Sequence, residues 1–95
     1  MKAKLEWIGW CQEGGHDKIW AILALSDTSF ATIWGRRGKQ LQSKTKDGGS
    51  WERKSLIRAK ISKGYVQIPT ADLDRVYPEF RDDINNVAMM LVLQY

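Results

Sequence analysis

The sequence has little cysteine and little histidine, the side chains on which disulfides and most protein zinc centres depend. It contains one of each, Cys11 and His16, among 95 residues. A lone cysteine cannot form an internal disulfide, and a lone histidine without a cysteine pair lacks the partners of a zinc site. We therefore expect no metal ion and a reducing compartment: the cytoplasm, on the nucleoid in a bacterium, or the nucleus in a eukaryote.

Long apolar runs are also lacking. The two longest, residues 19–25 and 87–93, fall far short of the ~20 residues that a helix needs to cross a bilayer. Residues 1–6 are not followed by the uninterrupted apolar segment of a signal peptide. We expect a protein with no membrane partner.

The patterns that accompany catalysis are missing as well. The sequence has no G-x-S-x-G, no P-loop and no Cys/His arrangement for a nucleophile. Asp82 and Asp83 are adjacent carboxylates, but acid and base catalysis requires two carboxyl groups whose surroundings separate their pKa values, which neighbours on a polar segment rarely have. We expect no catalytic residue, no cofactor and no enzymatic activity.

Basic charge is abundant, and it is concentrated in the middle of the chain. The net charge of +4 divides into −1 for residues 1–33, +8 for residues 34–65 and −3 for residues 66–95. A basic segment of this kind suits a polyanionic ligand, because lysines and arginines that bind phosphates release the counterions condensed on them. A solvated basic surface without a partner is the plainer interpretation. The ten cations are Arg36, Arg37, Lys39, Lys44, Lys46, Arg53, Lys54, Arg58, Lys60 and Lys63.

Hydrophobic content of 43% and five tryptophans suffice for one core, so we expect a single domain over residues 1–95. Short apolar segments separated by turn residues predict strands. These are residues 5–10, 19–25 and 30–34, with residues 39–45 as a possible return strand. Residues 19–25 are almost wholly apolar, so their periodicity fits a buried helix as well as a central strand. Because side chains alternate along a strand, Phe30, Thr32, Trp34 and Arg36 should share one face.

The segment after residue 50 fits two structures. Ser50 is a suitable N-cap, and a helix over residues 51–63 would end at Gly64. Ile57, Ala59 and Ile61 nevertheless alternate with polar residues, as in a strand. The pattern alone leaves both alternatives open.

The C-terminal third gives weaker indications. Residues 65–68 look extended, and residues 70–72 resemble the start of a capped helix. Pro78 suits the first position of a further helix, in which Phe80, Ile84, Val87 and Leu91 follow helical spacing. Residues 87–93 fit a final strand equally well.

Three motifs in order resemble one known family. Residues 18–22, Lys-Ile-Trp-Ala-Ile, resemble its N-K-[FY]-[YW]-x-[IL] strand, and residues 34–36 read Trp-Gly-Arg. Residues 56–65 resemble its helix that ends in K-x-x-K-G-Y. Over about residues 5–68 the chain thus resembles a WGR domain, a module of DNA-damage-activated poly(ADP-ribose) polymerases and of small bacterial proteins. Residues 69–95 lie outside the resemblance as a C-terminal extension.

Two positions depart from the family pattern. Gly38 and Gln42 match its G-x-x-G-Q, but Leu41 replaces the second glycine. Asp17 stands where the family has asparagine before the strand lysine, which removes an amide donor and adds a negative charge.

The resemblance implies an α+β fold: a twisted, mainly antiparallel sheet with one helix packed across it. We expect residues 69–95 to add a helical or mixed C-terminal extension. The resemblance implies that residues 51–63 are helical. It also implies a non-catalytic module that contacts DNA backbone and ends or nicks without reading base sequence. In the family the motif tryptophan stacks at a DNA break, the motif arginine contacts DNA or a neighbouring domain, and the strand lysine approaches the backbone. The residues that correspond to these three are Trp34, Arg36 and Lys18, and we expect the site to include Gly35, Arg37, Lys39 and Gln42 as well.

Other interpretations of the same residues remain. The basic and aromatic surface could dock an acidic protein or domain, and it could hold RNA. Trp34 could be an ordinary core residue. We expect Tyr65 to be structural, and we expect core or half-buried positions for the remaining tryptophans, Trp7, Trp10, Trp20 and Trp51.

Overall fold

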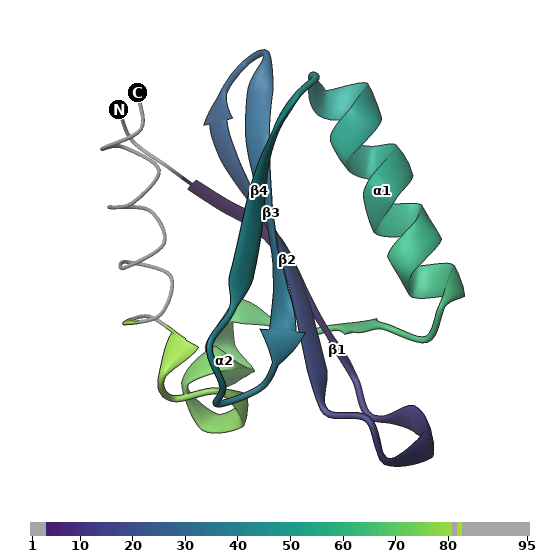
Figure 1. The fold of residues 1–95 in the computed structure, drawn as a ribbon, viewed down its shortest axis with the longest axis vertical. Coiled ribbons are helices and arrows are strands. Elements are labelled where there is room, and N and C mark those ends of the chain that lie inside the picture. Colours follow the sequence, from purple (N-terminus) through teal and green to yellow (C-terminus); the bar gives the residue numbers. More distant parts are fainter. Residues whose placement is uncertain (1–3, 81, 83–95) are drawn as a thin grey trace.

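Five strands form one antiparallel sheet in the computed structural model, which describes residues 4–80 and 82 (Figure 1). The strands are β1 (Lys4–Cys11), β2 (Lys18–Ser26), β3 (Ser29–Arg36), β4 (Gln42–Asp47) and β5 (Val66–Gln67). β1 to β4 form a meander, and β5 pairs with β1, which gives the order β4-β3-β2-β1-β5. The predicted antiparallel sheet is confirmed.

One main helix, α1 (Ser50–Ser62), packs against one face of the sheet (Figure 1). The shorter α2 (Thr70–Val76) packs against the opposite face, and a 3-10 turn, η1 (Glu13–Gly15), joins β1 to β2. The fold is therefore α+β, and the helical alternative for residues 51–63 is the one that forms. No helix in the described part of the chain is both long and apolar enough to span a membrane.

The core consists of two hydrophobic clusters, one on each face of the sheet. β2 contributes side chains to both because it is apolar along almost its whole length. Ile19 and Ala21 are fully buried and project toward α2. Trp20 and Ile22 project the other way, as alternation along a strand requires, and join the cluster beneath α1. The buried members of that cluster are Trp7, Trp20, Ile22 and Phe30, with Trp34, Leu56, Ile57 and Tyr65 packed against them.

The ring of Trp7 lies over the backbone of Gly9. A Cβ atom at residue 9 would come within 2.3 Å of the Trp7 ring, closer than real Cβ contacts. The space left by the glycine lets the Trp7 indole pack at 60° to that of Trp20, with ring centroids 5.8 Å apart.

A β-bulge at Glu6 anchors α1. The register of β1 with β2 shifts between Leu5 and Trp7, so Glu6 is the extra residue. Its carboxylate accepts a 2.6 Å hydrogen bond from Nε of Arg53, the one buried residue of α1. The bulge thus turns an acid toward the helix, where it neutralises a guanidinium that the packing has removed from water.

Three local predictions need correction. The return strand begins at Gln42 rather than near residue 39, because the chain turns through Gly38 (φ 80°) and the Lys39 amide donates to the Arg36 carbonyl. The N-cap of α1 is Gly49 rather than Ser50. The Glu52 carboxylate accepts a 2.7 Å hydrogen bond from the Gly49 amide, which starts the helix one residue earlier.

Trp51 is the third correction, because 71% of its surface is exposed. The face of α1 that meets the sheet carries Arg53, Leu56, Ile57 and Lys60, at helical spacing, and Trp51 lies off this stripe. The end of α1 is as predicted, with Gly64 at φ 101° just beyond it.

The C-terminal elements are shorter than the sequence suggested. Of residues 65–68 only Val66–Gln67 pair as a strand, and the helix predicted from residue 70 ends at Val76. Most of the further helix proposed after Pro78, and all of the alternative strand over residues 87–93, lie outside the described residues.

The ion pair between the bulge and α1 predicts a stability effect. Glu6→Ala leaves the Arg53 guanidinium buried without its partner, and should lower the free energy of unfolding by about 2 kcal/mol, less than for a fully buried pair because Glu6 is partly exposed. Urea unfolding followed by circular dichroism measures this change. The double variant Glu6→Ala/Arg53→Met should recover more than half of the loss. A loss below about 0.5 kcal/mol for Glu6→Ala would show that the pair does not anchor the helix.

Candidate nucleic-acid interface

A groove of about 460 Å³ opens between α1 and the face of the sheet that it covers. Residues of β2, β3, β4 and α1, together with Tyr65, line it, and we call it the basic groove. Its lining contains five cations, three aromatic residues and no aspartate or glutamate. The lining residues are Lys18, Arg36, Lys44, Lys46, Lys60, Trp20, Trp34, Tyr65, Thr32, Gly35 and Leu56.

Strand register brings the cations and aromatic rings together. Lys18 is paired with Arg36, and Trp20 with Trp34. Paired residues project from the same face of an antiparallel sheet. On β4, Lys44 and Lys46 pair with residues 32 and 30, so both lysines extend the same surface. The prediction that residues 30, 32, 34 and 36 share one face is confirmed.

The cations of the basic groove have no acidic partner in the part of the chain that the structure describes. The ion pairs there join other residues: Arg37 with Asp17, Arg53 with Glu6, and Arg75 with Asp72. Lys18 and Arg36 face each other directly across two strands, an arrangement of like charges that disfavours folding. The groove therefore has an excess of positive charge that an anionic ligand could neutralise.

Lys60 extends this charge to the helix side of the groove. Its ammonium nitrogen lies 5.5 Å from the centroid of the Trp20 ring and 5.8 Å from that of Tyr65. Burial lowers the pKa of Lys60, and the neighbouring Lys63 and Lys46 lower it further. Burial also raises the pKa of the Tyr65 hydroxyl, with a smaller contribution from Cys11.

Trp34 is both a packing residue and an accessible one. It packs against the aromatic cluster beneath α1 and remains half-buried, whereas its partner Trp20 is only 4% exposed. Trp34 therefore has ring surface available at the basic groove that Trp20 lacks.

Gly35 allows the motif strand to meet the turn that follows it. Its φ is 153°, and an added Cβ would lie 3.1 Å from Leu41 Cδ2 and 3.3 Å from the Gln40 carbonyl oxygen. Leu41 packs against the core cluster on the α2 side. Only a glycine between Trp34 and Arg36 accommodates this turn without strain.

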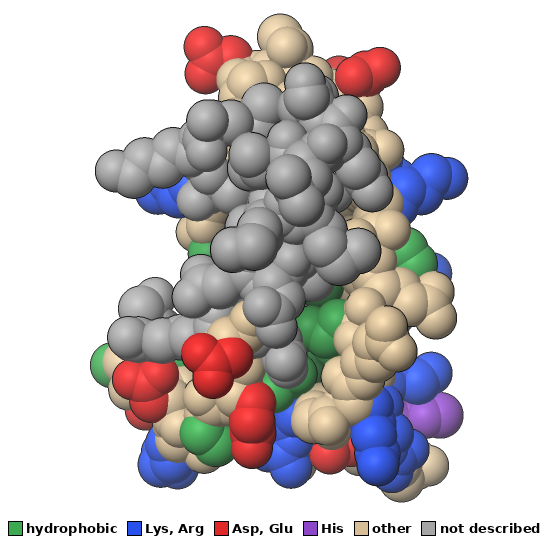
Figure 2. Space-filling model, turned by 60° about the vertical axis from the view of Figure 1, so that its left-hand side comes forward, with side chains coloured by type: hydrophobic (Ala, Val, Ile, Leu, Met, Phe, Trp, Pro, Cys, Tyr) green, Lys and Arg blue, Asp and Glu red, His purple; other side chains and the backbone are tan. Residues whose placement is uncertain are grey.

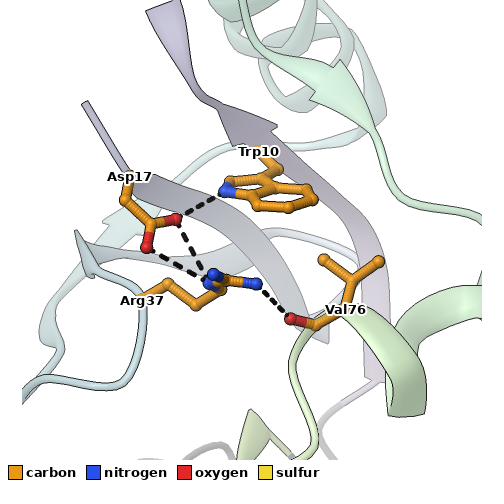
Figure 3. A network of polar contacts seen from close by, with 4 residues as sticks. All are labelled: Trp10, Asp17, Arg37 and Val76. Atoms are coloured by element: carbon orange, nitrogen blue, oxygen red, sulfur yellow. Dashed lines mark hydrogen bonds and ion pairs between the residues drawn. The ribbon is translucent and has the colours of Figure 1, made fainter. Parts of the chain in front are cut away.

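Arg37 lies apart from the basic groove. It is the next residue after Arg36, and its guanidinium pairs with Asp17 at 3.2 Å, lies 4.5 Å from the centroid of the Trp10 ring and donates to the Val76 carbonyl at 2.6 Å (Figure 3). Trp10 in turn donates from Nε1 to Asp17 at 2.7 Å. These contacts tie the end of α2 to the sheet, and they engage the negative charge of the Asp17 carboxylate.

The other predicted site residues divide between the groove and its edge. Lys18, Trp34, Gly35 and Arg36 line it. Gln42 is exposed on β4, directly opposite Trp34, and Lys39 is exposed in the turn before β4, but neither is a lining residue.

Seven lining residues were missed as site residues: Trp20, Thr32, Lys44, Lys46, Leu56, Lys60 and Tyr65. Period-two alternation in Lys44-Thr45-Lys46 was the available signal for the two lysines of β4. Lys60 and Tyr65 reach the groove through the packing of α1, which no local pattern reveals.

The side of the molecule opposite α1 carries acidic side chains among basic ones (Figure 2). Acidic side chains appear on the lower part of the face drawn in Figure 2, where α2 lies. α2 and the turn after it contribute Asp72, Asp74 and Glu79. Nowhere in residues 4–80 do three or more His, Cys, Asp or Glu side chains come together as a metal ion would require.

The lowered pKa of Lys60 predicts a pH-dependent stability difference. The pKa of Lys60 in the folded state lies below its unfolded value of 10.5, so its positive charge lowers the free energy of unfolding at pH 7. This destabilisation disappears as the pH rises through the interval between the folded and unfolded pKa values, where the side chain loses its proton. Lys60→Met should therefore be slightly more stable than the wild type at pH 7, by up to about 0.5 kcal/mol, since the side chain is half exposed and screened. The difference should shrink toward pH 10.5. Urea unfolding at both pH values tests this, and a less stable variant at pH 7 would contradict it.

Comparison with known proteins provides no relative for this chain. No protein-family model, curated protein or solved structure matches it. The resemblance to WGR domains therefore depends on the motifs around Trp34 and Arg36. What the basic groove binds has to be inferred from its own shape and charge.

Proposed function

We propose that this protein is a non-catalytic WGR-type module that binds DNA through the basic groove, in the cytoplasm or nucleus. The observation that carries the proposal is the composition of the groove. Five cations without acidic partners among the described residues surround the accessible ring of Trp34. An anionic ligand with a flat apolar part satisfies both features.

Nucleic acid has this combination of chemical groups. A base or sugar stacked on an indole contributes about 1–3 kcal/mol. Arg36 offers a planar fork for phosphate oxygens, and the lysines offer point charges. Such contacts hold the backbone without distinguishing bases, so the module recognises DNA structure rather than sequence.

DNA ends and nicks suit Trp34 better than continuous duplex does. A base inside a duplex is stacked on both faces, whereas a terminal or interrupted base pair leaves one face free. An indole in a groove can meet that free face without disrupting the helix.

Fluorescence anisotropy with intact, nicked and blunt-ended duplexes tests the proposal. Trp34→Ala should weaken binding about 5- to 150-fold, the equivalent of one lost stack. Arg36→Ala should weaken binding and reduce the slope of log affinity against log salt by about one phosphate contact. Circular dichroism and thermal unfolding of each variant show whether the fold is intact at the assay temperature.

Matched controls lie on the outer side of α1. Trp51 and Arg58 are exposed there, outside the basic groove. Trp51→Ala and Arg58→Ala remove the same side-chain types and should change affinity less than about twofold. If they weaken binding as much as Trp34→Ala and Arg36→Ala, the groove is not the binding surface.

Docking of an acidic protein is the alternative that the same cations support. It depends on charge and would be largely indifferent to Trp34→Ala. Loss of affinity in the arginine variant alone, with no preference for any duplex, would favour that alternative. RNA shares the phosphate and base chemistry, and an RNA duplex in the same titration distinguishes it from DNA.

A further inference from the structure

Cations precede and follow Trp34 along the direction of the strands. Arg36 lies two residues after Trp34 on the same face of β3, with Lys18 opposite it. Thr32 lies two residues before Trp34, with Lys44 opposite it. Each such step along one face of a strand is about 7 Å. The accessible indole therefore lies between two groups of cations, which we call the two charged rows. One row is Lys18 with Arg36, and the other is Lys44 with Lys46.

The dimensions of the basic groove suit one strand of nucleic acid. Its volume of about 460 Å³ is within the ~300–1,000 Å³ of sites that hold a single small ligand. Leu56 and Lys60 of α1 form its wall on the helix side, and Lys60 Nζ comes within 5.5 Å of the centroid of the Trp20 ring. A base inside a continuous duplex has to leave the stack before its face can meet the Trp34 ring in this groove.

We propose that an unpaired stretch of a nucleic-acid strand lies along the basic groove, with one base stacked on Trp34 and the flanking phosphates held on either side. Lys18 and Arg36 bind the phosphate on one side, and Lys44 and Lys46 bind the phosphate on the other. This inference depends on the nucleic-acid-binding function proposed above. It narrows the ligand to the single-stranded part of an end, a gap or an opened nick.

The two charged rows distinguish a strand from a free nucleotide. A mononucleotide has a phosphate on one side of its base only, so it engages one row and leaves the other unused. A strand engages both rows. Removal of a cation from either row should therefore weaken the binding of an oligonucleotide.

The test compares four labelled ligands by fluorescence anisotropy: a DNA strand of about 12 nucleotides, the blunt duplex of the same sequence, that duplex with a single-stranded overhang, and the RNA strand. Deoxyadenosine monophosphate is added as an unlabelled competitor. The single strand and the overhang duplex should bind at least about tenfold more tightly than the blunt duplex, as expected for one stacked base. Tighter binding of RNA than of DNA supports the same geometry and assigns the strand to RNA.

Two substitutions at Trp34 separate stacking from folding. Trp34→Leu keeps an apolar side chain in the cluster but cannot stack, and should weaken single-strand binding about 5- to 150-fold, more than it weakens binding of the blunt duplex. Trp34→Phe keeps an aromatic face and should retain most of the affinity. Unfolding curves confirm that both variants are folded.

Substitutions in the two rows test the path of the strand. Arg36→Ala and Lys44→Ala should each weaken single-strand binding and reduce its salt dependence by about 0.7 in slope, the value for one contact to a single strand. Lys54→Ala, on the exposed outer side of α1, removes the same charge outside the groove and should have little effect.

Three results would overturn the inference. Equal affinity for single strand and blunt duplex, both weakened alike by Trp34→Leu, would leave nucleic-acid binding intact and exclude the unpaired strand. Competition by the mononucleotide as effective as that by the unlabelled strand would show a site for a single free nucleotide. No binding to any of the ligands would instead refute the proposed function itself.

Discussion

The register of the central strands is the constraint on which both the core and the basic groove depend. Pairing of Lys18 with Arg36 and of Trp20 with Trp34 directs charged and aromatic side chains to the same face. A slip of one residue would turn Trp34 and Arg36 to the opposite face, because side chains alternate with a period of two. It would also bring the fully buried Ile33 to the face that carries the groove. Burial of both faces of the sheet thus fixes which residues line the basic groove.

The basic groove contains charge repulsion that the core has to offset. Lys18 opposes Arg36, and burial together with Lys63 and Lys46 lowers the pKa of Lys60. Acidic residues that could relieve this repulsion are absent from the lining. Local arrangements that disfavour folding are typical of binding sites, where the ligand supplies the missing interaction. Binding of an anion should therefore stabilise the fold as well as occupy the groove.

The sequence pattern indicated strands near residues 5–10, 19–25 and 30–34, because these short segments are bounded by turn residues, while the antiparallel sheet was implied only by the resemblance. The pattern left the helix over residues 51–63 undecided, since Ile57 and Ile61 fit two periods and only the packing of Leu56 and Ile57 on the sheet selects one. Trp51 was expected to be a core or half-buried residue on residue type alone, whereas its position relative to the buried stripe of α1 leaves it exposed. Glu6 and Arg53 are 47 residues apart, a separation at which no local pattern indicates a contact.

Neighbouring arginines show why charge density alone could not define the site. Arg36 and Arg37 contribute equally to the basic segment, yet Arg36 lines the groove while Arg37 is held by Asp17 and the Val76 carbonyl. Their separation follows from strand geometry at the end of β3, and the partner that engages Arg37 comes from 20 residues away. Arg53 is likewise neutralised within the fold. The cations available to a ligand are those that the sheet and α1 leave unpaired around Trp34, and their arrangement in two rows limits the ligand more strongly than their number.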